Sequence, residues 1–395
     1  MITFVVLPWQ MYQITRSTLA VGMLGLVEFF PTILMAFIGG AVADYVDRRR
    51  WIWYMELGMV LCDVVLICNS LFPHPSSTVL FLVAGAFAAL TGLQRPSREA
   101  LTQNVVPLEY MPAVGALNSF RWSSAAVIGP ALGGMLAATF GAIPAYAIDL
   151  VTFVISLFTL AMMHSSPPAN TVERPSLESL VAGLRYAVKR KELMGTYLID
   201  INAMFFGMPM ALFPALAEKF GVSTLGWLYA APAAGIAVAS LTSGWTSRVS
   251  RHGLAVVIAA TLWGVAIIFF GLVENFWLAI FFLALAGAAD GISGIFRLTI
   301  WNQTIPNYLR GRLAGIEMVS YTSGPLLGNA EAGIVATAFS IRTSIVSGGV
   351  LCVLGSLLLA LCLPEFLRYE ASSGLARKQA EEEALNTEAQ RHREN

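Results

Sequence analysis

The residues most able to do chemistry in this chain are ionisable groups that interrupt long apolar stretches. If these stretches cross a lipid bilayer, each charged side chain costs several kcal/mol unless it has a partner or reaches water. Acids outnumber bases, so some of the acids must be protonated or hydrated. A carboxyl group removed from water holds its proton tightly and can release it when a cavity opens. The acids are Glu28, Glu56, Asp63, Asp149, Asp200, Asp290, Glu317 and Glu331, and the bases are Arg121 and Arg297.

Position within the apolar stretches ranks these acids as candidates for proton coupling. Asp63 and Asp290 lie near the middle of their stretches, and Glu28 and Asp149 are alternatives nearer one end. Asp290 and Arg297 are seven residues apart, which puts both on one face of a helix and predicts an intramembrane ion pair. The competing interpretation is that each acid only locks two helices together by a hydrogen bond. The residues alone leave both interpretations open.

Composition places these stretches in a membrane. Hydrophobic residues make up 57% of the 395 residues, charged residues make up 12%, and the mean hydropathy is +0.70. Soluble domains carry about 25% charged residues. The net charge of zero gives no indication of a nucleic-acid partner. We therefore expect an all-α, polytopic membrane protein with the lipid bilayer as a partner.

Runs of about 20 apolar residues predict the membrane-spanning helices. The N-terminal piece, 1–14, is too short to span, and we expect its helix to begin upstream of Met1. With this truncated first helix the predicted number is twelve. The other eleven are predicted at 20–43, 51–72, 78–95, 112–138, 142–163, 194–217, 224–247, 254–272, 276–300, 313–338 and 343–363.

A proline-containing and then amphipathic segment divides the chain into two halves. We expect pseudo-symmetric six-helix bundles at 1–163 and 194–363, a cytoplasmic linker with an amphipathic helix at 164–193, and a charged cytoplasmic tail at 364–395. Arginine and lysine gather in the loops on the side of both termini, and such clusters mark the cytoplasmic side. This pattern predicts a multi-pass protein of the cell membrane (inner or plasma membrane) with both termini in the cytoplasm.

A short basic loop, 39–50, follows the second apolar stretch. It resembles the loop between helices 2 and 3 of the major facilitator superfamily, which usually reads Gly-x-x-x-Asp-Arg-x-Gly-Arg-Arg. Gly40, Asp44, Arg48 and Arg49 fit that pattern, whereas Tyr45 and Asp47 depart from it. An ordinary basic cytoplasmic loop is the alternative. The resemblance implies that Asp44 acts in the conformational change.

Two glycine-proline motifs occupy corresponding helices of the two halves. Glycine lets neighbouring helices approach closely and slide, and paired Gly/Pro-interrupted helices are typical of transporters built from repeats. We expect the motif residues to control gating, together with the four matching loop residues above. They are Gly129, Pro130, Gly133 and Gly134 in the first half, and Gly324, Pro325 and Gly328 in the second.

The Gly129 motif resembles the antiporter signature of major facilitator exporters. Nearly the whole chain is similar to the enterobactin exporter and macrolide-efflux branch, with the strongest parallel at 324–333. This resemblance implies proton antiport of an amphipathic small molecule, either a siderophore or a macrolide-like drug, by alternating access. The intramembrane arginine motif of many drug antiporters is missing from 78–95, which leaves the coupling route open. We expect the protein to act as a monomer.

Other function classes fit the residues less well. None of the four lysines follows a phosphate-binding Gly-x-x-x-x-Gly spacing, and the four histidines are scattered among loops and tail. The sequence therefore predicts no ATP-driven pump, no enzyme, no catalytic residue, no metal ligand and no cofactor. A non-transporting membrane receptor or a lipid-handling protein on the same fold remains an alternative.

Overall fold

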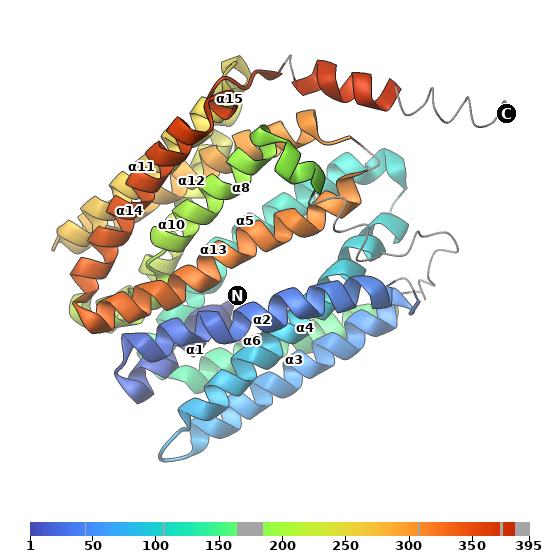
Figure 1. The fold of residues 1–395 in the computed structure, drawn as a ribbon. Coiled ribbons are helices and arrows are strands. Elements are labelled where there is room, and N and C mark those ends of the chain that lie inside the picture. The colour runs from blue at the N-terminus through green and yellow to red at the C-terminus, as the bar shows by residue number, and fades with distance from the viewer. Residues whose placement is uncertain (44, 106, 164–184, 307–308, 372–373, 384–395) are drawn as a thin grey trace. The chain divides into compact units, whose positions relative to one another are not determined.

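Helices make up nearly all of the described chain (Figure 1). The computed structural model describes residues 1–395 except 44, 106, 164–184, 307–308, 372–373 and 384–395. Within the described part of the chain, extended pairing is limited to one isolated antiparallel bridge between Arg251 and Glu370. The prediction of an all-α fold is confirmed.

The chain forms two compact units. Unit 1 comprises Met1–Pro175, Pro209–Ala233 and Leu326–Ser344, and unit 2 comprises Ser176–Met208, Ala234–Pro325 and Ile345–Asn395. Of the four crossings that fall among the described residues, three lie at or within two residues of a proline, namely Pro209, Pro232 and Pro325. The predicted bundle, linker and tail boundaries after residues 163, 193 and 363 stay a prediction.

Unit 1 is built around the first six long helices. Helices α2 and α4 lie side by side, and α3 packs against both α4 and α6 (Figure 1). Its core includes the fully buried side chains of Val6, Leu66, Leu80 and Tyr146. The elements are α1 Ile2–Thr15, α2 Thr18–Ala43, α3 Arg48–Leu71, α4 Ser77–Val105, η1 Leu108–Tyr110, α5 Met111–Phe140, α6 Ala142–Met162, η2 Met210–Leu212, α9 Phe213–Phe220, η3 Val222–Thr224, the first part of α10 (Leu225–Leu241) and the last part of α13 (Arg310–Ala338).

Unit 2 is dominated by the neighbouring pair α11 and α12. Helix α8 packs against both members of this pair, and the short α15 packs against α8 and α11. The elements are α8 Lys191–Phe206, η4 Ser243–Arg248, α11 His252–Leu272, α12 Phe276–Thr304, α14 Ile341–Cys362 and α15 Pro364–Leu367, together with the remaining parts of α10 and α13. Residues 185–189 and 374–383 are also helical.

Local chemistry explains where several helices begin and turn. The Asp47 carboxylate accepts hydrogen bonds from the backbone N–H groups of Arg49 and Arg50, which caps the start of α3. The Asn275 side chain caps α12 in the same way. Gly141 has a φ of 82° and connects α5 to α6 without a longer loop. Prolines inside helices are Pro8, Pro31, Pro96, Pro130, Pro232 and Pro325.

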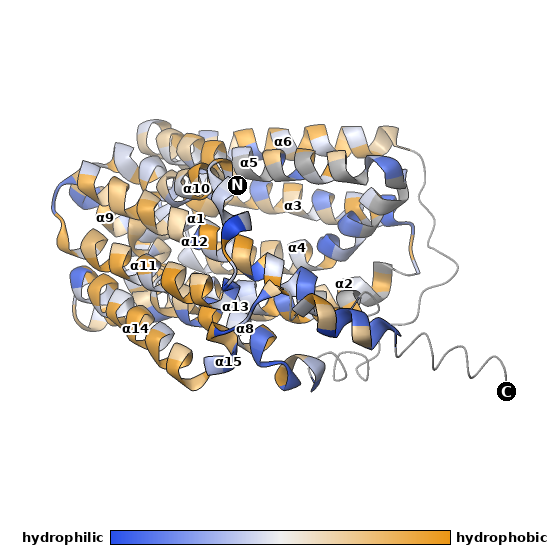
Figure 2. Ribbon diagram, turned by 90° about the horizontal axis from the view of Figure 1, so that it is seen from above, coloured by the Kyte–Doolittle hydropathy of each residue, from blue (hydrophilic) through white to orange (hydrophobic). Residues whose placement is uncertain are grey.

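The helices have the length and composition of membrane spans. Nine helical segments of the described residues are long and apolar enough to cross a bilayer. Helices α1, α5 and α13 bring the number to the twelve that the sequence predicts, and α1, with 14 residues, is the shortest of these three. Figure 2 shows apolar residues along most helices, with hydrophilic ribbon concentrated in the last helix before the C-terminus. The prediction of a polytopic membrane protein is confirmed.

Candidate functional site

Two of the predicted acids meet at one hydroxyl group in unit 1. The Thr3 hydroxyl of α1 lies 2.5 Å from Asp149 Oδ2 of α6 and 3.4 Å from Asp63 Oδ1 of α3. The Thr3 backbone N–H also donates to Asp149, over 3.2 Å. All three residues are buried, and Asp63 is 0% exposed. The second oxygen of Asp63, Oδ2, has no hydrogen-bond partner among the described residues.

This geometry constrains the protons of the carboxyl pair. Thr3 has a single hydroxyl hydrogen, and its shorter contact is to Asp149. The Thr3 hydroxyl is thus placed to donate to either carboxyl group. Two charged carboxylates so close together would be costly in so dry a site. The two acids therefore share one hydrogen-bonding hydroxyl group inside a dry site.

A second polar layer lies further along the same three helices. The Tyr146 hydroxyl of α6 donates to Gln10 Oε1 of α1 over 2.8 Å, and Gln10 Nε2 donates to the Ser70 hydroxyl of α3 over 2.7 Å. The Ser70 hydroxyl donates in turn to the Leu66 carbonyl. Tyr146 interacts electrostatically with both acids of the pair. The two layers thus form one polar column inside an otherwise apolar bundle.

A cavity of about 580 Å³ opens beyond the second layer. It is bounded by the ends of α1, α3 and α5, the loop between α3 and α4, and the start of α6. Gln10 and Ser70 belong both to its wall and to the hydrogen-bonded layer. The wall is formed by Trp9, Gln10, Gln13, Ile14, Ser70, Pro73, His74, Pro75, Phe140, Gly141, Ala142 and Ile143.

Unit 2 contains a partly buried charge cluster of its own. Arg297 of α12 forms ion pairs with Asp200 of α8 and with Asp290 of α12, the latter with 3.3 Å between Arg297 Nη2 and Asp290 Oδ1. The structure therefore brings together Asp290 and Arg297, the two residues that the spacing suggested. Asp200 completes the cluster and offsets the arginine charge further. Whether Asp290 couples protons stays a prediction.

The remaining acid candidate, Glu28, lies apart from both clusters. Its side chain on α2 is half-buried and interacts electrostatically with Tyr229 of α10 in unit 1. Glu331 of α13 is also half-buried. Hence only Asp63 and Asp149, among the four proposed coupling acids, share a direct partner.

The glycines of the first predicted gating motif lie where backbones nearly touch. A Cβ on Gly134 of α5 would come within 2.3 Å of the Gly226 nitrogen of α10, and one on Gly133 within 3.2 Å of Ile2 Cα on α1. Gly129 likewise faces Met1, and Pro130 is buried beside them. The motif therefore lets α5 approach both α1 and α10 within unit 1.

A second close approach in unit 1 joins α2 to the end of α13. A Cβ on Gly22 would lie 2.6 Å from the Asn329 carbonyl oxygen, and the hydroxyl groups of Thr18 and Thr337 are hydrogen-bonded over 2.9 Å. The Asn329 side chain also accepts from the Ala211 backbone N–H. At one end of this region Arg16 and Glu218 form an exposed ion pair. These contacts join α2 and η2 to the end of α13.

The second gating motif also lies at a close helix contact. A Cβ on Gly324 would meet Met204 Cβ of α8 at 2.6 Å, within unit 2. Gly328 is buried and Pro325 is half-buried. Because a Cβ atom is fixed to its own backbone, the contact with Met204 also requires a residue without a side chain at position 324.

The basic loop is only partly described. Asp44 lies outside the described residues, and the space beside Gly40 is open, whereas a Cβ on Gly39 would meet the Leu93 backbone of α4 at 2.6 Å. Arg48 is buried, and Arg49 Nη1 donates to the Met163 carbonyl at the end of α6 over 2.5 Å. The loop arginines are thus held by neighbouring helix ends, and their part in gating stays a prediction.

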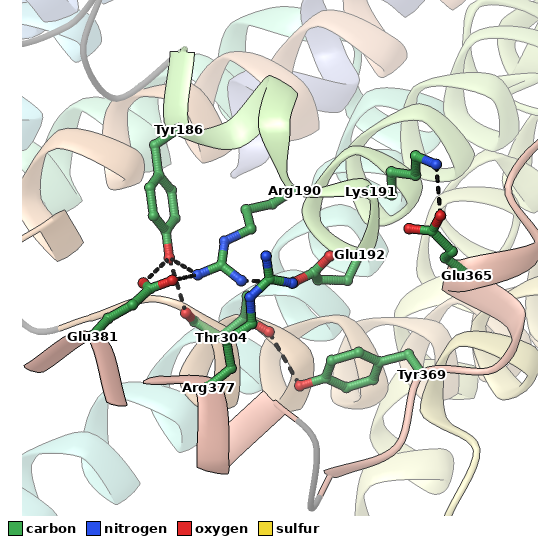
Figure 3. A network of polar contacts seen from close by, with 9 residues as sticks. All are labelled: Tyr186, Arg190, Lys191, Glu192, Thr304, Glu365, Tyr369, Arg377 and Glu381. Atoms are coloured by element: carbon green, nitrogen blue, oxygen red, sulfur yellow. Dashed lines mark hydrogen bonds and ion pairs between the residues drawn. The ribbon is translucent and has the colours of Figure 1, made fainter. Parts of the chain in front are cut away.

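Figure 3 shows a polar network that the sequence analysis did not single out. Arg190, with a side chain only 4% exposed, pairs with Glu192 at the start of α8 and with Glu381 of the tail. The Tyr186 hydroxyl donates to Glu381 and accepts from Arg190. Burial raises the pKa of Tyr186, so this hydroxyl stays protonated and can donate. The described tail is therefore anchored to the end of the linker.

Further contacts extend this network within unit 2. Tyr369 and Thr304, at the end of α12, share a hydrogen bond of 3.1 Å, and Lys191 pairs with Glu365 over 2.6 Å (Figure 3). The Phe366 side chain fits against Gly195 of α8, and its backbone approaches Gly253 of α11. The tail thus packs against three helix ends rather than projecting into solvent at this point.

Sequence reasoning missed the uncharged members of the polar column, although their spacing carried a signal. Thr3 and Gln10 are seven residues apart on α1, as Asp63 and Ser70 are on α3, so each pair shares a helix face. Tyr146 precedes Asp149 by three residues on α6. A search for polar residues at matching helical spacing around the acids would have found them.

The helical architecture, the intramembrane carboxyl groups and the glycine-mediated helix contacts define a membrane transporter. Residues 1–393 match the family described as transmembrane secretion effector. The chain belongs to this family of major facilitator transporters, which confirms the family resemblance noted from the sequence.

Several known proteins are similar to this chain over most of its length. The enterobactin exporter EntS of Shigella flexneri is 30% identical over 374 residues, which cover 92% of this chain and 88% of that protein. The proteins of the same name from Shigella boydii serotype 18 and Escherichia coli O81 are 29% identical over 373 residues, with the same coverage. A crystal structure of a POT family transporter in complex with 5-aminolevulinic acid has a TM-score of 0.68 at 11% identity, covering 92% of this chain and 96% of that one. The last likeness shows the fold.

Proposed function

We propose that this protein exports an amphipathic small molecule of the siderophore class from the cytoplasm in exchange for protons. The observation that carries the substrate class is the similarity to enterobactin exporters over 92% of the chain. A macrolide-like drug is the second candidate, because an aromatic-lined transporter cavity suits any bulky, partly apolar ligand. Transport proceeds by alternating access, in which the protein exposes its binding site to one membrane face at a time.

The buried acids support proton coupling. Asp63 and Asp149 meet at Thr3, and Asp290 lies in the Arg297 cluster. An intramembrane carboxyl group that can lose its charge by protonation is suited to carry a proton between membrane faces. Glu28 is the fourth candidate. In this scheme the proton and the substrate cross the membrane in opposite directions.

The glycine contacts support a gate at the end of unit 1 that includes Arg16. Helix backbones approach closely where Gly134 meets Gly226 and where Gly22 meets Asn329, and a side chain at either glycine would prevent this approach. We place this face outside the cell, with both termini and the loop around Asp44 in the cytoplasm of an inner or plasma membrane. Asp44, Arg48 and Arg49 then act on the inner gate, and the protein works as a monomer.

A reconstitution experiment tests this function. Purified protein in sealed liposomes is given a proton gradient, and accumulation of a catecholate siderophore is followed together with internal pH. Uphill accumulation that a protonophore abolishes is expected. Binding of the siderophore without movement of either solute would refute the proposal and favour a receptor or a lipid-handling protein.

Substitution of the deepest acids separates coupling from transport. Asp63→Asn or Asp290→Asn is expected to abolish uphill export and to leave exchange of substrate down its own gradient partly intact, because the carboxyl proton is lost while the cavity persists. The exposed Glu99, which pairs with Arg95 at the surface, provides the control Glu99→Gln. Uphill pumping at the wild-type rate by both acid variants would show that the coupling acids lie elsewhere.

A further inference from the structure

The polar column in unit 1 has two layers that the helix geometry keeps in register. Helix α1 contributes Thr3 and Gln10, and α3 contributes Asp63 and Ser70, each pair separated by seven residues. At 1.5 Å per residue, seven residues correspond to about 10 Å along each helix. Tyr146 on α6 is fully buried and reaches from the level of the acids to Gln10.

Two residues, Gln10 and Ser70, connect this column to the cavity beyond it, and Gln10 also reaches Tyr146. Gln10 has its amide oxygen on the Tyr146 hydroxyl and its amide nitrogen on Ser70, yet it also contributes to the cavity wall. Its side chain is only 5% exposed, so it closes the inner end of the cavity. A carboxamide makes both hydrogen bonds here and has no titratable proton to pass on. Gln10 therefore blocks proton transfer while it makes these two hydrogen bonds.

On the other side of Gln10 from the cavity, one oxygen atom of the Asp63 carboxyl group is unpaired among the described residues. This atom, Oδ2, is buried. Unsatisfied buried polar atoms are rare in native structures, and an unpaired carboxyl oxygen is a natural position for an exchangeable proton or a transient water. The cavity, Gln10 and this oxygen lie along the same three helices.

We infer that the cavity is the vestibule through which the Asp63–Thr3–Asp149 site exchanges its proton with one face of the membrane, and that Gln10 and Tyr146 form the gate between them. This inference rests on the proposed proton coupling and assigns it an access route. When Gln10 turns away, water from the vestibule reaches Tyr146 and the acids. A hydronium ion then gives one proton to the Asp63 carboxylate and leaves as water, so the site gains one positive charge.

The groups that surround Asp63 are compatible with a single-proton site. The titratable and charged groups facing it are Asp149 and Tyr146 of α6, Cys62 of α3 and the Met1 amino group. Thr3 is the neutral bridge between the two acids, and we assign it as a positioning residue. Its hydroxyl contacts both carboxyl groups and holds them in position.

The gate is tested by proton leak in liposomes without substrate, measured with a trapped pH-sensitive dye. Loss of the two hydrogen bonds in Gln10→Ala, at about 1 kcal/mol each or less, is expected to raise the leak roughly tenfold. The double variant Gln10→Ala/Asp63→Asn is expected to return the leak to the wild-type rate, because the proton-binding group is gone. Tyr146→Phe, which keeps the ring and loses the hydroxyl, is expected to raise the leak as well, with the exposed Tyr54→Phe as its matched control.

Thr3 is tested by the pH profile of export. Thr3→Val is expected to move the pH midpoint of export, Thr3→Ser to restore it, and Thr159→Val, at an exposed threonine of α6, to leave it unchanged. An unaltered leak in both Gln10→Ala and Tyr146→Phe, or a Gln10→Ala leak that persists without Asp63, would overturn the inference. Proton-driven export by the wild type would stand in either case, whereas its absence would refute the proposed function itself.

Discussion

The contact between Gly134 of α5 and Gly226 of α10 gives the sharpest prediction about gating. In Gly134→Ala the added Cβ would lie 2.3 Å from the Gly226 nitrogen and 2.4 Å from its Cα, where an ordinary contact begins at 3.4 Å. Both opposing atoms are backbone, so no side chain can turn aside. The helices must separate by about 1 Å at this point to relieve the overlap.

The cost of this overlap sets the size of the effect. Overpacking costs typically about 1–3 kcal/mol, and it applies only to the conformation in which α5 and α10 touch. A bias of this size shifts a two-state equilibrium by about 5- to 150-fold. We therefore expect Gly134→Ala to populate an open gate and to slow turnover, because the closed state is needed once in each transport cycle.

Spin labels across the contact measure the shift directly. Cysteines replacing Thr139 on α5 and Val222 in η3, in a background without the four native cysteines, report the separation of these elements within unit 1. Gly134→Ala is expected to enlarge the longer-distance population. Gly115→Ala is the matched control, because a Cβ at Gly115 of the same helix meets nothing within 4 Å. Equal distance distributions in the two variants would refute the reasoning.

Two further predictions concern ionisable groups in unit 2. Arg297→Met leaves Asp200 and Asp290 without their shared countercharge and is expected to lower the free energy of unfolding by about 3–5 kcal/mol. Thermal unfolding measures this loss of stability, and the assignment would be contradicted if adding Asp200→Asn recovered none of the lost stability. Burial raises the pKa of Tyr186 above the unfolded value of about 10, so its contribution to stability is complete below pH 10 and is lost as the pH rises above 10 towards the folded value. The thermal unfolding midpoint is expected to fall above pH 10, and to fall less in Tyr186→Phe; identical profiles would exclude this tyrosine as a source.

Much of the fold could be predicted because lipid imposes a simple rule on the sequence. Backbone polar groups must pair within each span, so runs of apolar residues such as 254–272 give helices, here α11 at His252–Leu272. Helix ends also carried local signals, as Asp47 does at the start of α3. The division of a span was harder to foresee: Pro209 separates α8 from α9 where the sequence indicated one helix at 194–217.

Only the charged residues of the candidate site could be predicted from the sequence. A charged residue within an apolar run is costly in free energy and therefore indicates a function. Asp63, Asp149 and Asp290 could be predicted for this reason. Thr3 and Gln10 carry no such cost and occur in many membrane helices, and their importance comes from tertiary contacts that one sequence does not display. The tail contacts of Arg190 were hidden for the same reason, because partners almost 200 residues apart share no local pattern.

The prolines of the two gating motifs have a consequence for hydration. Pro130 and Pro325 lie inside α5 and α13. A proline within a helix deprives the carbonyl four residues earlier of its intrahelical N–H donor, as Pro130 does for the carbonyl of Ala126. Hydrocarbon offers such an oxygen no substitute. We therefore expect the Ala126 face of α5 to turn towards water, ligand hydroxyl groups or neighbouring donors throughout the cycle, which makes the first motif a fixed hydrogen-bond acceptor within the apolar layer of the membrane.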